Sequence, residues 1–269
     1  MRDIIKKVGR KKGKTLAVFA GVHGDEEPGI EALKEVVLES EIEKGEVYFV
    51  FANPRAIEKG VRYIDKNLNR CFLKNNKAFC YEEKRAQELK QILDKSDALL
   101  DLHASNNPCS TPFIICEQNS YPLARIFDFK IISSGWDAIE PGATDGYMLQ
   151  QGKPGLCLEC GPKWYSDENK ELAKKSIYQF FSYFGAIQTR VAFSQTKKKF
   201  IHVYHAVIKN DPGFRFVKEF HDFEILPPGK IFAYDSYREY KAGNNDCIIF
   251  PSPEAEIGDE VFILGKYIE

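Results

Sequence analysis

The strongest constraint on the fold is a series of short apolar runs that alternate with stretches of helical periodicity. The runs have the length and the β-branched or aromatic content of buried strands, and they lie at residues 15–20, 47–51, 98–103, 113–116, 130–132 and 156–159. Apolar residues recur at helical spacing between them, over 28–37, 81–95 and 166–184. Pro28 and Ser166 suit the first positions of two of these helices. The alternation predicts a three-layer α/β/α sandwich around a mixed, largely parallel sheet.

The pattern changes near residue 190, where helical periodicity ends. From Val191 onward the chain consists of short strand-like pieces separated by Gly, Pro and Asn. We therefore expect two domains, an α/β domain over residues 1–190 and a smaller all-β domain over residues 191–269.

Composition excludes several classes of protein. A hydrophobic content of 43% is ample for a packed core, and a net charge of −1 gives no reason to expect nucleic acid or an anionic membrane as partner. The basic N-terminus is not followed by the apolar segment of a secretory signal. Seven cysteines, an odd number, do not resemble a disulfide framework. We expect a cytoplasmic protein; the composition does not indicate its oligomeric state.

Two histidines and a glutamate follow the apolar runs at positions typical of a metal site. His23 and Glu26 lie in the motif GVHGDE directly after the run at 15–20, and His103 ends the run at 98–103. In open α/β sheets, ligands gather beyond the carboxyl ends of strands. Two imidazoles and one carboxylate are the ligand set of hydrolytic zinc, with the fourth position left for water. The competing interpretation is a hydrogen-bonded core histidine at 103 and a helix N-terminal carboxylate at 26.

Two further groups of polar residues carry possible chemistry. Arg62, Asn69 and Arg70 lie in a long polar segment, residues 53–78, and such donors suit a carboxylate or a developing oxyanion. Glu159 emerges from the apolar run at 156–159, so it is partly desolvated and suited to act as a base. The alternatives are a solvated charged loop and an ordinary charge at a strand end.

Four motifs occur in the order seen in a known family. GVHGDE at 21–26, NLNRCF at 67–72, DLHAS at 101–105 and LECGP at 158–162 resemble the succinylglutamate desuccinylase/aspartoacylase family of the carboxypeptidase A-like zinc hydrolases. The resemblance covers roughly residues 15–165 through motifs, and the C-terminal part more loosely. It implies a zinc carboxypeptidase-like fold with residues 1–190 as the catalytic domain.

The resemblance also implies roles for individual residues. His23, Glu26 and His103 would bind one zinc ion per chain, and Glu159 would be the general base. Arg62 would stabilise the oxyanion of the tetrahedral intermediate. Asn69 and Arg70 would bind a substrate carboxylate beside the scissile amide.

The stretch that precedes Glu159 differs from that of the aspartoacylases. Aspartoacylases carry a substrate-binding arginine some ten residues before the catalytic glutamate, whereas the stretch at 143–147 has none. The same stretch resembles the carboxypeptidase segment that shapes the pocket for the terminal residue, which makes Thr144 a substrate-binding residue. Both the aspartoacylases and the carboxypeptidases place a tyrosine over the substrate, and Tyr147 is our candidate for it because it lies nearby in the sequence. We therefore do not expect N-acetylaspartate as the substrate.

Three functions compete at this point. The first is a zinc amidohydrolase that cleaves an N-acyl amino acid or a similar small carboxylate-bearing amide. The second is a metallocarboxypeptidase that removes the C-terminal residue of a short or modified peptide. The third is a metal-binding scaffold without turnover, which would need neither Glu159 nor Arg62.

Overall fold

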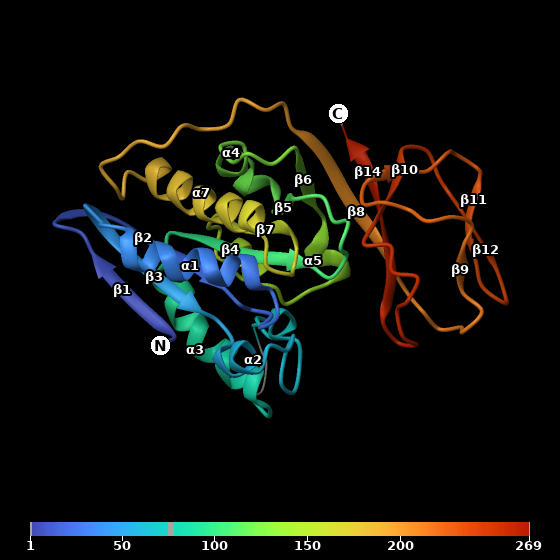
Figure 1. The fold of residues 1–269 in the computed structure, drawn as a ribbon, viewed down its shortest axis with the longest axis horizontal. Coiled ribbons are helices and arrows are strands. Elements are labelled where there is room, and N and C mark those ends of the chain that lie inside the picture. Colours follow the sequence, from blue (N-terminus) through green and yellow to red (C-terminus); the bar gives the residue numbers. More distant parts are fainter. Residues whose placement is uncertain (1, 75–77, 269) are drawn as a thin grey trace.

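One 11-stranded sheet runs through the structure, and both halves of the chain contribute strands to it. The computed structural model describes residues 2–74 and 78–268. The strand order is β1-β3-β2-β4-β7-β5-β6-β8-β14-β13-β10, and a separate three-stranded sheet has the order β12-β11-β9. Figure 1 shows the helices gathered over the N-terminal part of the large sheet and the small sheet at the opposite end of the molecule.

The first seven strands alternate with helices along the chain. The strands are β1 (Ile4–Val8), β2 (Lys11–Ala20), β3 (Lys44–Phe51), β4 (Ala98–Ser105), β5 (Phe113–Ile115), β6 (Ile131–Ser134) and β7 (Gly155–Pro162). The helices are α1 (Glu27–Glu39), α2 (Pro54–Lys59), α3 (Tyr81–Lys95), α4 (Tyr121–Ala124), α5 (Trp136–Ile139), α6 (Thr144–Gln150) and α7 (Asp167–Tyr183), with 3-10 turns η1 (Leu68–Arg70) and η2 (Gln118–Ser120). From β1 to β8, five of the seven strand pairings are parallel.

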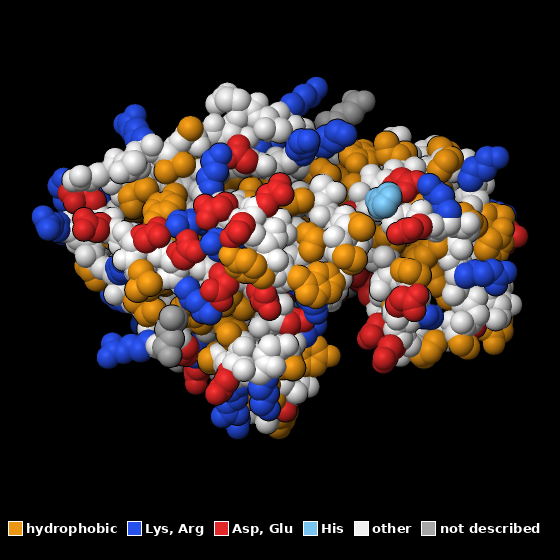
Figure 2. Space-filling model, viewed as in Figure 1, with side chains coloured by type: hydrophobic (Ala, Val, Ile, Leu, Met, Phe, Trp, Pro, Cys, Tyr) orange, Lys and Arg blue, Asp and Glu red, His pale blue; other side chains and the backbone are white. Residues whose placement is uncertain are grey.

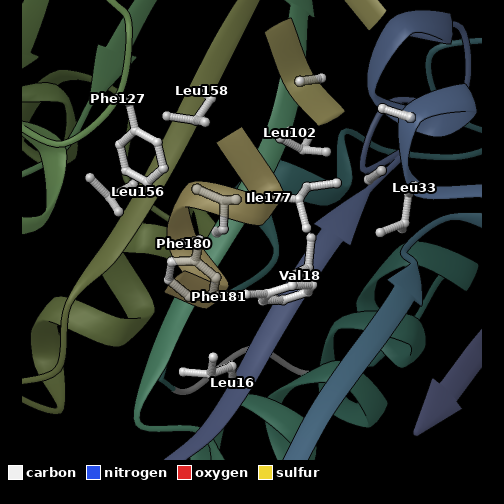
Figure 3. Close-up of a cluster of buried hydrophobic side chains, with 14 of the residues drawn as sticks. Leu16, Val18, Leu33, Leu102, Phe127, Leu156, Leu158, Ile177, Phe180 and Phe181 are labelled. Atoms are coloured by element: carbon white, nitrogen blue, oxygen red, sulfur yellow. The ribbon is translucent and has the colours of Figure 1, made fainter. Parts of the chain in front are cut away.

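Helices α1 and α7 cover one face of this sheet. Their apolar stripes meet the side chains of β2, β4 and β7 in one buried cluster, and Figure 3 shows Leu33 of α1 and Ile177 of α7 in this layer. Ser166 is the N-cap of α7, and its side chain accepts a hydrogen bond from Asn169 N at 3.4 Å. Burial of this stripe is what holds an otherwise charged helix on the sheet.

Helix α3 covers the other face. Ala86, Leu89 and Leu93 pack with Ala17 and Phe19 of β2 in a second buried cluster. Strand β2 is therefore apolar on both sides, as central parallel strands are. The expected three-layer α/β/α architecture is confirmed. None of the described helices is long and apolar enough to cross a membrane.

The C-terminal strands extend the large sheet. They are β8 (Lys199–Ile208), β9 (Arg215–Phe216), β10 (Glu224–Ile225), β11 (Ile231–Tyr234), β12 (Glu239–Lys241), β13 (Asp246–Ile249) and β14 (Glu260–Ile268). Strand β8 pairs in parallel with β6 and antiparallel with β14. The chain reaches β8 through residues 185–198, where we expect the domain boundary, and the division itself stays a prediction.

The long polar segment is ordered by one buried carboxylate. Glu82 of α3 accepts hydrogen bonds from the backbone N of Ile64 at 2.7 Å, Asp65 at 3.1 Å and Lys66 at 3.2 Å. It also accepts one from Asn53 Nδ2 at 3.3 Å, and its side chain is fully buried. These contacts fix the turn between α2 and η1, which carries Arg62 and leads to Arg70 at the end of η1. Residues 75–77 of the expected segment lie outside the described residues.

Replacement of Glu82 tests this anchor. Glu82→Ala leaves three backbone N–H groups and an amide without their acceptor, so we expect a loss of about 2–4 kcal/mol in the free energy of unfolding. Gln91→Ala, at an exposed position of the same helix, should change it by less than about 0.5 kcal/mol. Urea unfolding measures both, and hydrogen exchange should accelerate at residues 62–70 in Glu82→Ala alone. Equal stability of the two variants would contradict the anchoring role.

Candidate metal and substrate site

The predicted site residues meet at the carboxyl edge of the parallel strands. His23 and Glu26 lie on the loop that leaves β2, while His103 and Glu159 lie near the ends of β4 and β7. The parallel register pairs His103 directly with Glu159, so the two side chains are neighbours across the sheet. Because of this register, His103 and Glu159 lie in one site although they are far apart in the sequence.

Glu26 lies between the two histidine rings. Its Oε1 is 2.6 Å from His23 Nδ1, and its Oε2 is 3.2 Å from His103 Nδ1. The donor atoms of the three residues lie within 4.8 Å of one another, and all three side chains are buried. This is the nitrogen and oxygen donor set that zinc prefers, on a cluster small enough to surround one ion.

Each ring has a polar oxygen close to its other nitrogen. Asn67 Oδ1 lies 3.0 Å from His23 Nε2, and Asp101 Oδ2 lies 3.1 Å from His103 Nε2. Thr144 Oγ1 donates to the same Asp101 oxygen at 2.5 Å. Such outer contacts hold the free nitrogen of each imidazole towards the shared centre, as they do around protein metal ions. We did not predict Asn67 or Asp101, although Asp101 stands two residues before His103 on the same face of β4.

The pKa values of the clustered side chains are shifted by burial and by their mutual charges. Burial acts to raise the pKa of Glu26, yet the neighbouring His23 and His103 rings outweigh it and hold that pKa well below its usual range. Burial lowers the pKa of His23, which favours the neutral imidazole that binds metals. Burial also opposes the charged form of His103, but Asp101 and Glu26 together raise its pKa. A divalent cation fits this balance of charges and donors.

Glu159 presents an unsatisfied carboxylate beside the cluster. Its side chain is 9% exposed, and its Oε2 has no hydrogen-bond partner within the described part of the chain. Burial, and then the charge of Glu26, raise the pKa of Glu159 to about 8. A carboxyl group with this proton affinity can both take up and give back a proton near neutral pH.

Arg62, Asn69 and Arg70 line one cavity with the cluster and Glu159, and its volume is about 1240 Å³. Arg62 Nη1 lies 3.3 Å from Glu26 Oε1. Arg70 forms an ion pair with Glu140 and donates from Nη1 to the backbone oxygen of Asn69 at 2.9 Å. The structure therefore brings seven of the nine predicted site residues together.

Thr144 and Tyr147 are not brought to the cavity. Thr144 is fully buried on Asp101, and the Tyr147 hydroxyl donates to Asp94 Oδ1 at 2.8 Å. Neither side chain is among the described residues that line the cavity, because α6 turns both away from it. In this geometry Thr144 contacts Asp101, which neighbours the His103 ring, and its role in substrate binding stays a prediction.

The far wall of the cavity comes from the C-terminal strands and their loops. Its lining includes residues of the segments 214–221 and 250–260, which we did not predict as part of the site. The family resemblance reaches residues 250–251 and 257–261 only loosely, and these segments come to the cavity through the pairing of β14 with β8.

Comparison with known proteins identifies the same family as the motifs. The model of the succinylglutamate desuccinylase/aspartoacylase catalytic domain matches residues 12–180. A probable aspartoacylase of Trichodesmium erythraeum is 34% identical over 167 residues, which cover 56% of this chain and 57% of the relative. A succinylglutamate desuccinylase of Shewanella sp. (strain W3-18-1) is 25% identical over 288 residues, which cover 94% of this chain and 83% of the relative.

Solved structures share the whole fold. Succinylglutamate desuccinylase of Vibrio cholerae superimposes with a TM-score of 0.80 at 17% identity, over 100% of this chain and 86% of the other. The product-bound ectoine utilization protein EutE (DoeB) of Ruegeria pomeroyi gives 0.77 at 20% identity, over 98% and 87%. At such identities the likeness establishes the fold alone. With the family model matching well over half of its length, the chain belongs to the succinylglutamate desuccinylase/aspartoacylase family.

Proposed function

We propose that the protein is a zinc-dependent amidohydrolase that cleaves the amide bond of a small N-acyl amino acid. The observation that carries the proposal is the buried His23, Glu26 and His103 cluster beside the unpartnered carboxylate of Glu159. Family membership supports it, since the named activities of the relatives, aspartoacylase and succinylglutamate desuccinylase, are deacylations. The alignment spans only 57% and 63% of the length of two aspartoacylase relatives, so the substrate is inferred from the site.

His23, Glu26 and His103 would hold the ion. Zinc, when bound, supplies Lewis-acid polarisation of the substrate carbonyl and lowers the pKa of water towards about 7. The contacts of Asn67 and Asp101 keep both imidazoles aimed at the centre. The residue types favour zinc, because hard oxygen-binding cations use few imidazoles.

Glu159 is the proposed proton carrier. Its unpartnered Oε2 removes a proton from the attacking water and later delivers it to the nitrogen of the leaving amine. A raised proton affinity makes the first transfer, removal of the water's proton, easier than it would be for an ordinary glutamate. Arg62, whose guanidinium already lies at the cluster, would stabilise the negative charge that develops on the carbonyl oxygen.

Asn69 and Arg70 would bind the substrate carboxylate. They are adjacent on η1, and the Asn69 side chain is fixed by accepting from Thr144 N at 3.3 Å. A fixed pair of this kind positions the amide over the catalytic groups. The proposed enzyme would therefore require a free carboxylate on its substrate, whereas a general amidase would not.

Removal of single ligands tests the metal cluster. His103→Ala should abolish binding of one zinc equivalent, since two ligands remain in a buried site. Asp101→Asn should keep the stoichiometry but weaken zinc binding roughly 10- to 100-fold, because the His103 ring loses its orienting partner. Competition with a chromogenic chelator measures both, with the exposed His205→Ala as control. A full zinc equivalent in His103→Ala would remove this residue from the ligand set.

Glu159→Gln tests the activity itself. The amide cannot accept the proton, so turnover of N-acyl amino acids should fall by roughly 10²- to 10⁴-fold while zinc stays bound. Glu168→Gln, exposed on α7, is the matched control. The wild-type enzyme is assayed on N-acyl amino acids and on dipeptides. Release of C-terminal residues without deacylation would make it a carboxypeptidase, and no turnover of either class would leave a binding scaffold.

Arg70→Ala separates binding from chemistry. If Arg70 holds a carboxylate equally in the ground and transition states, KM should rise at least tenfold with little change in kcat. The exposed Arg190→Ala provides the control. A collapse of kcat at unchanged KM would instead assign Arg70 to the oxyanion.

A further inference from the structure

The cavity holds more carboxylates than cations. Its described lining contains four Arg or Lys residues and eight Asp or Glu residues. All four cations are engaged: Arg62 with Glu26, Arg70 with Glu140, Lys218 with Glu224, and Arg215 over the Tyr234 ring. Even with a divalent ion at the His23, Glu26 and His103 cluster, acidic side chains would outnumber the positive charges in the lining.

The excess lies on the wall formed by the C-terminal strands. Glu254, Asp259 and Glu260 line the cavity, and within the described residues their side chains form no hydrogen bond or ion pair. Figure 2 shows acidic side chains on the C-terminal side of the notch between the two halves of the molecule. Of the three, Glu260 is the least exposed.

Glu260 faces the substrate-binding side of the cavity. It is the first residue of β14 and pairs with Ile208, which also lines the cavity. Burial, and then the charge of Glu140, raise the pKa of Glu260 to about 8, and the more weakly felt Arg70 and Arg62 do not offset this. The carboxyl group thus lies among the residues that would hold the substrate, without a cation of its own.

The opposite rim is rigid. Gly142 packs so closely on Arg70 that a Cβ at position 142 would lie 2.8 Å from the Arg70 backbone oxygen. Phe72 N also donates to Gly142 O at 3.0 Å. The backbone at Arg70 is therefore packed against Gly142, and the Arg70 side chain is paired with Glu140 rather than with Glu260.

A second observation marks this cavity as a site for a polar ligand. Glu159, nine-tenths buried, lines it and has a carboxylate oxygen without a hydrogen-bond partner among the described residues. Buried polar atoms without partners are rare in folded proteins, so this cavity is built to be completed by a bound molecule.

We propose that Glu260 is a specificity-determining residue that receives a positively charged ammonium group of the substrate. The inference rests on the proposed function and narrows it to acyl amino acids that keep one free ammonium group besides the carboxylate. Arg70 would hold the carboxylate and Glu260 the ammonium, so the two side chains together would bind a molecule that carries both groups. A substrate with a second carboxylate would add negative charge to a wall that already carries too much.

Binding of three small molecules tests the proposal. Calorimetry with zinc-loaded Glu159→Gln protein compares Nα-acetyl-lysine, Nε-acetyl-lysine and Nα-acetyl-norleucine, so binding is measured without turnover. At least one acetyl-lysine should bind roughly tenfold or more tightly than acetyl-norleucine, which has no ammonium group. The favoured isomer shows on which side of the amide the ammonium lies. Adding Glu260→Gln should remove the preference and leave acetyl-norleucine binding within twofold.

Glu256→Gln is the matched control, because Glu256 is exposed in the same loop and is not among the described cavity residues. It should leave the preference unchanged. Equal binding of all three compounds, or a preference that survives Glu260→Gln, would overturn the role of Glu260. A different outcome would contradict the proposed function alone. In that case the wild-type enzyme deacylates no N-acyl amino acid, although the binding preference for the ammonium-bearing compound persists.

Discussion

The sharing of one buried carboxylate by two imidazoles is the interaction on which the site depends. Glu26 contacts His23 through one oxygen and His103 through the other, and this arrangement brings the loop after β2 against the end of β4. Its Oε2 also accepts from Ala104 N at 3.0 Å, so backbone and side chains close together around it. Several acidic groups buried near two imidazoles are costly unless positive charge compensates them. The donor atoms and charges of this cluster therefore suit a divalent cation.

Much of the site could be predicted because its chemistry follows single strands. His23, His103 and Glu159 each stand where an apolar run ends, and parallel strands end on a common edge. The α/β/α architecture was predictable for the same reason, since the runs and the helical stretches alternate. Thr144 and Tyr147 were misplaced because a short helix displays only some of its residues to a cavity. The direction of α6 is set by packing, and no local pattern encodes it.

The residues that escaped prediction act across long distances in the sequence. Glu82 lies 18 positions from Ile64, whose backbone it holds, and its neighbours make it look like one charge among many on an exposed helix. Glu260 is likewise an ordinary strand-end acid in the sequence. Its environment of Glu140, Arg70 and Arg62 arises only when β14 pairs with β8. Periodicity reports which face of an element is buried, whereas such partners depend on the tertiary fold.

The two walls of the cavity have different physical constraints, and this separates chemistry from selectivity. The parallel strand ends are locked by a core that is apolar on both faces, so their ligands tolerate little movement. The opposite wall is carried on loops between antiparallel strands, where side chains change at small cost to the fold. A charged side chain on this wall would change which substrates are attracted and would leave the cluster that would bind the metal unchanged. Under the proposed function, the His23, Glu26 and His103 cluster would carry the chemistry, and residues such as Glu260 on the opposite wall would set the substrate.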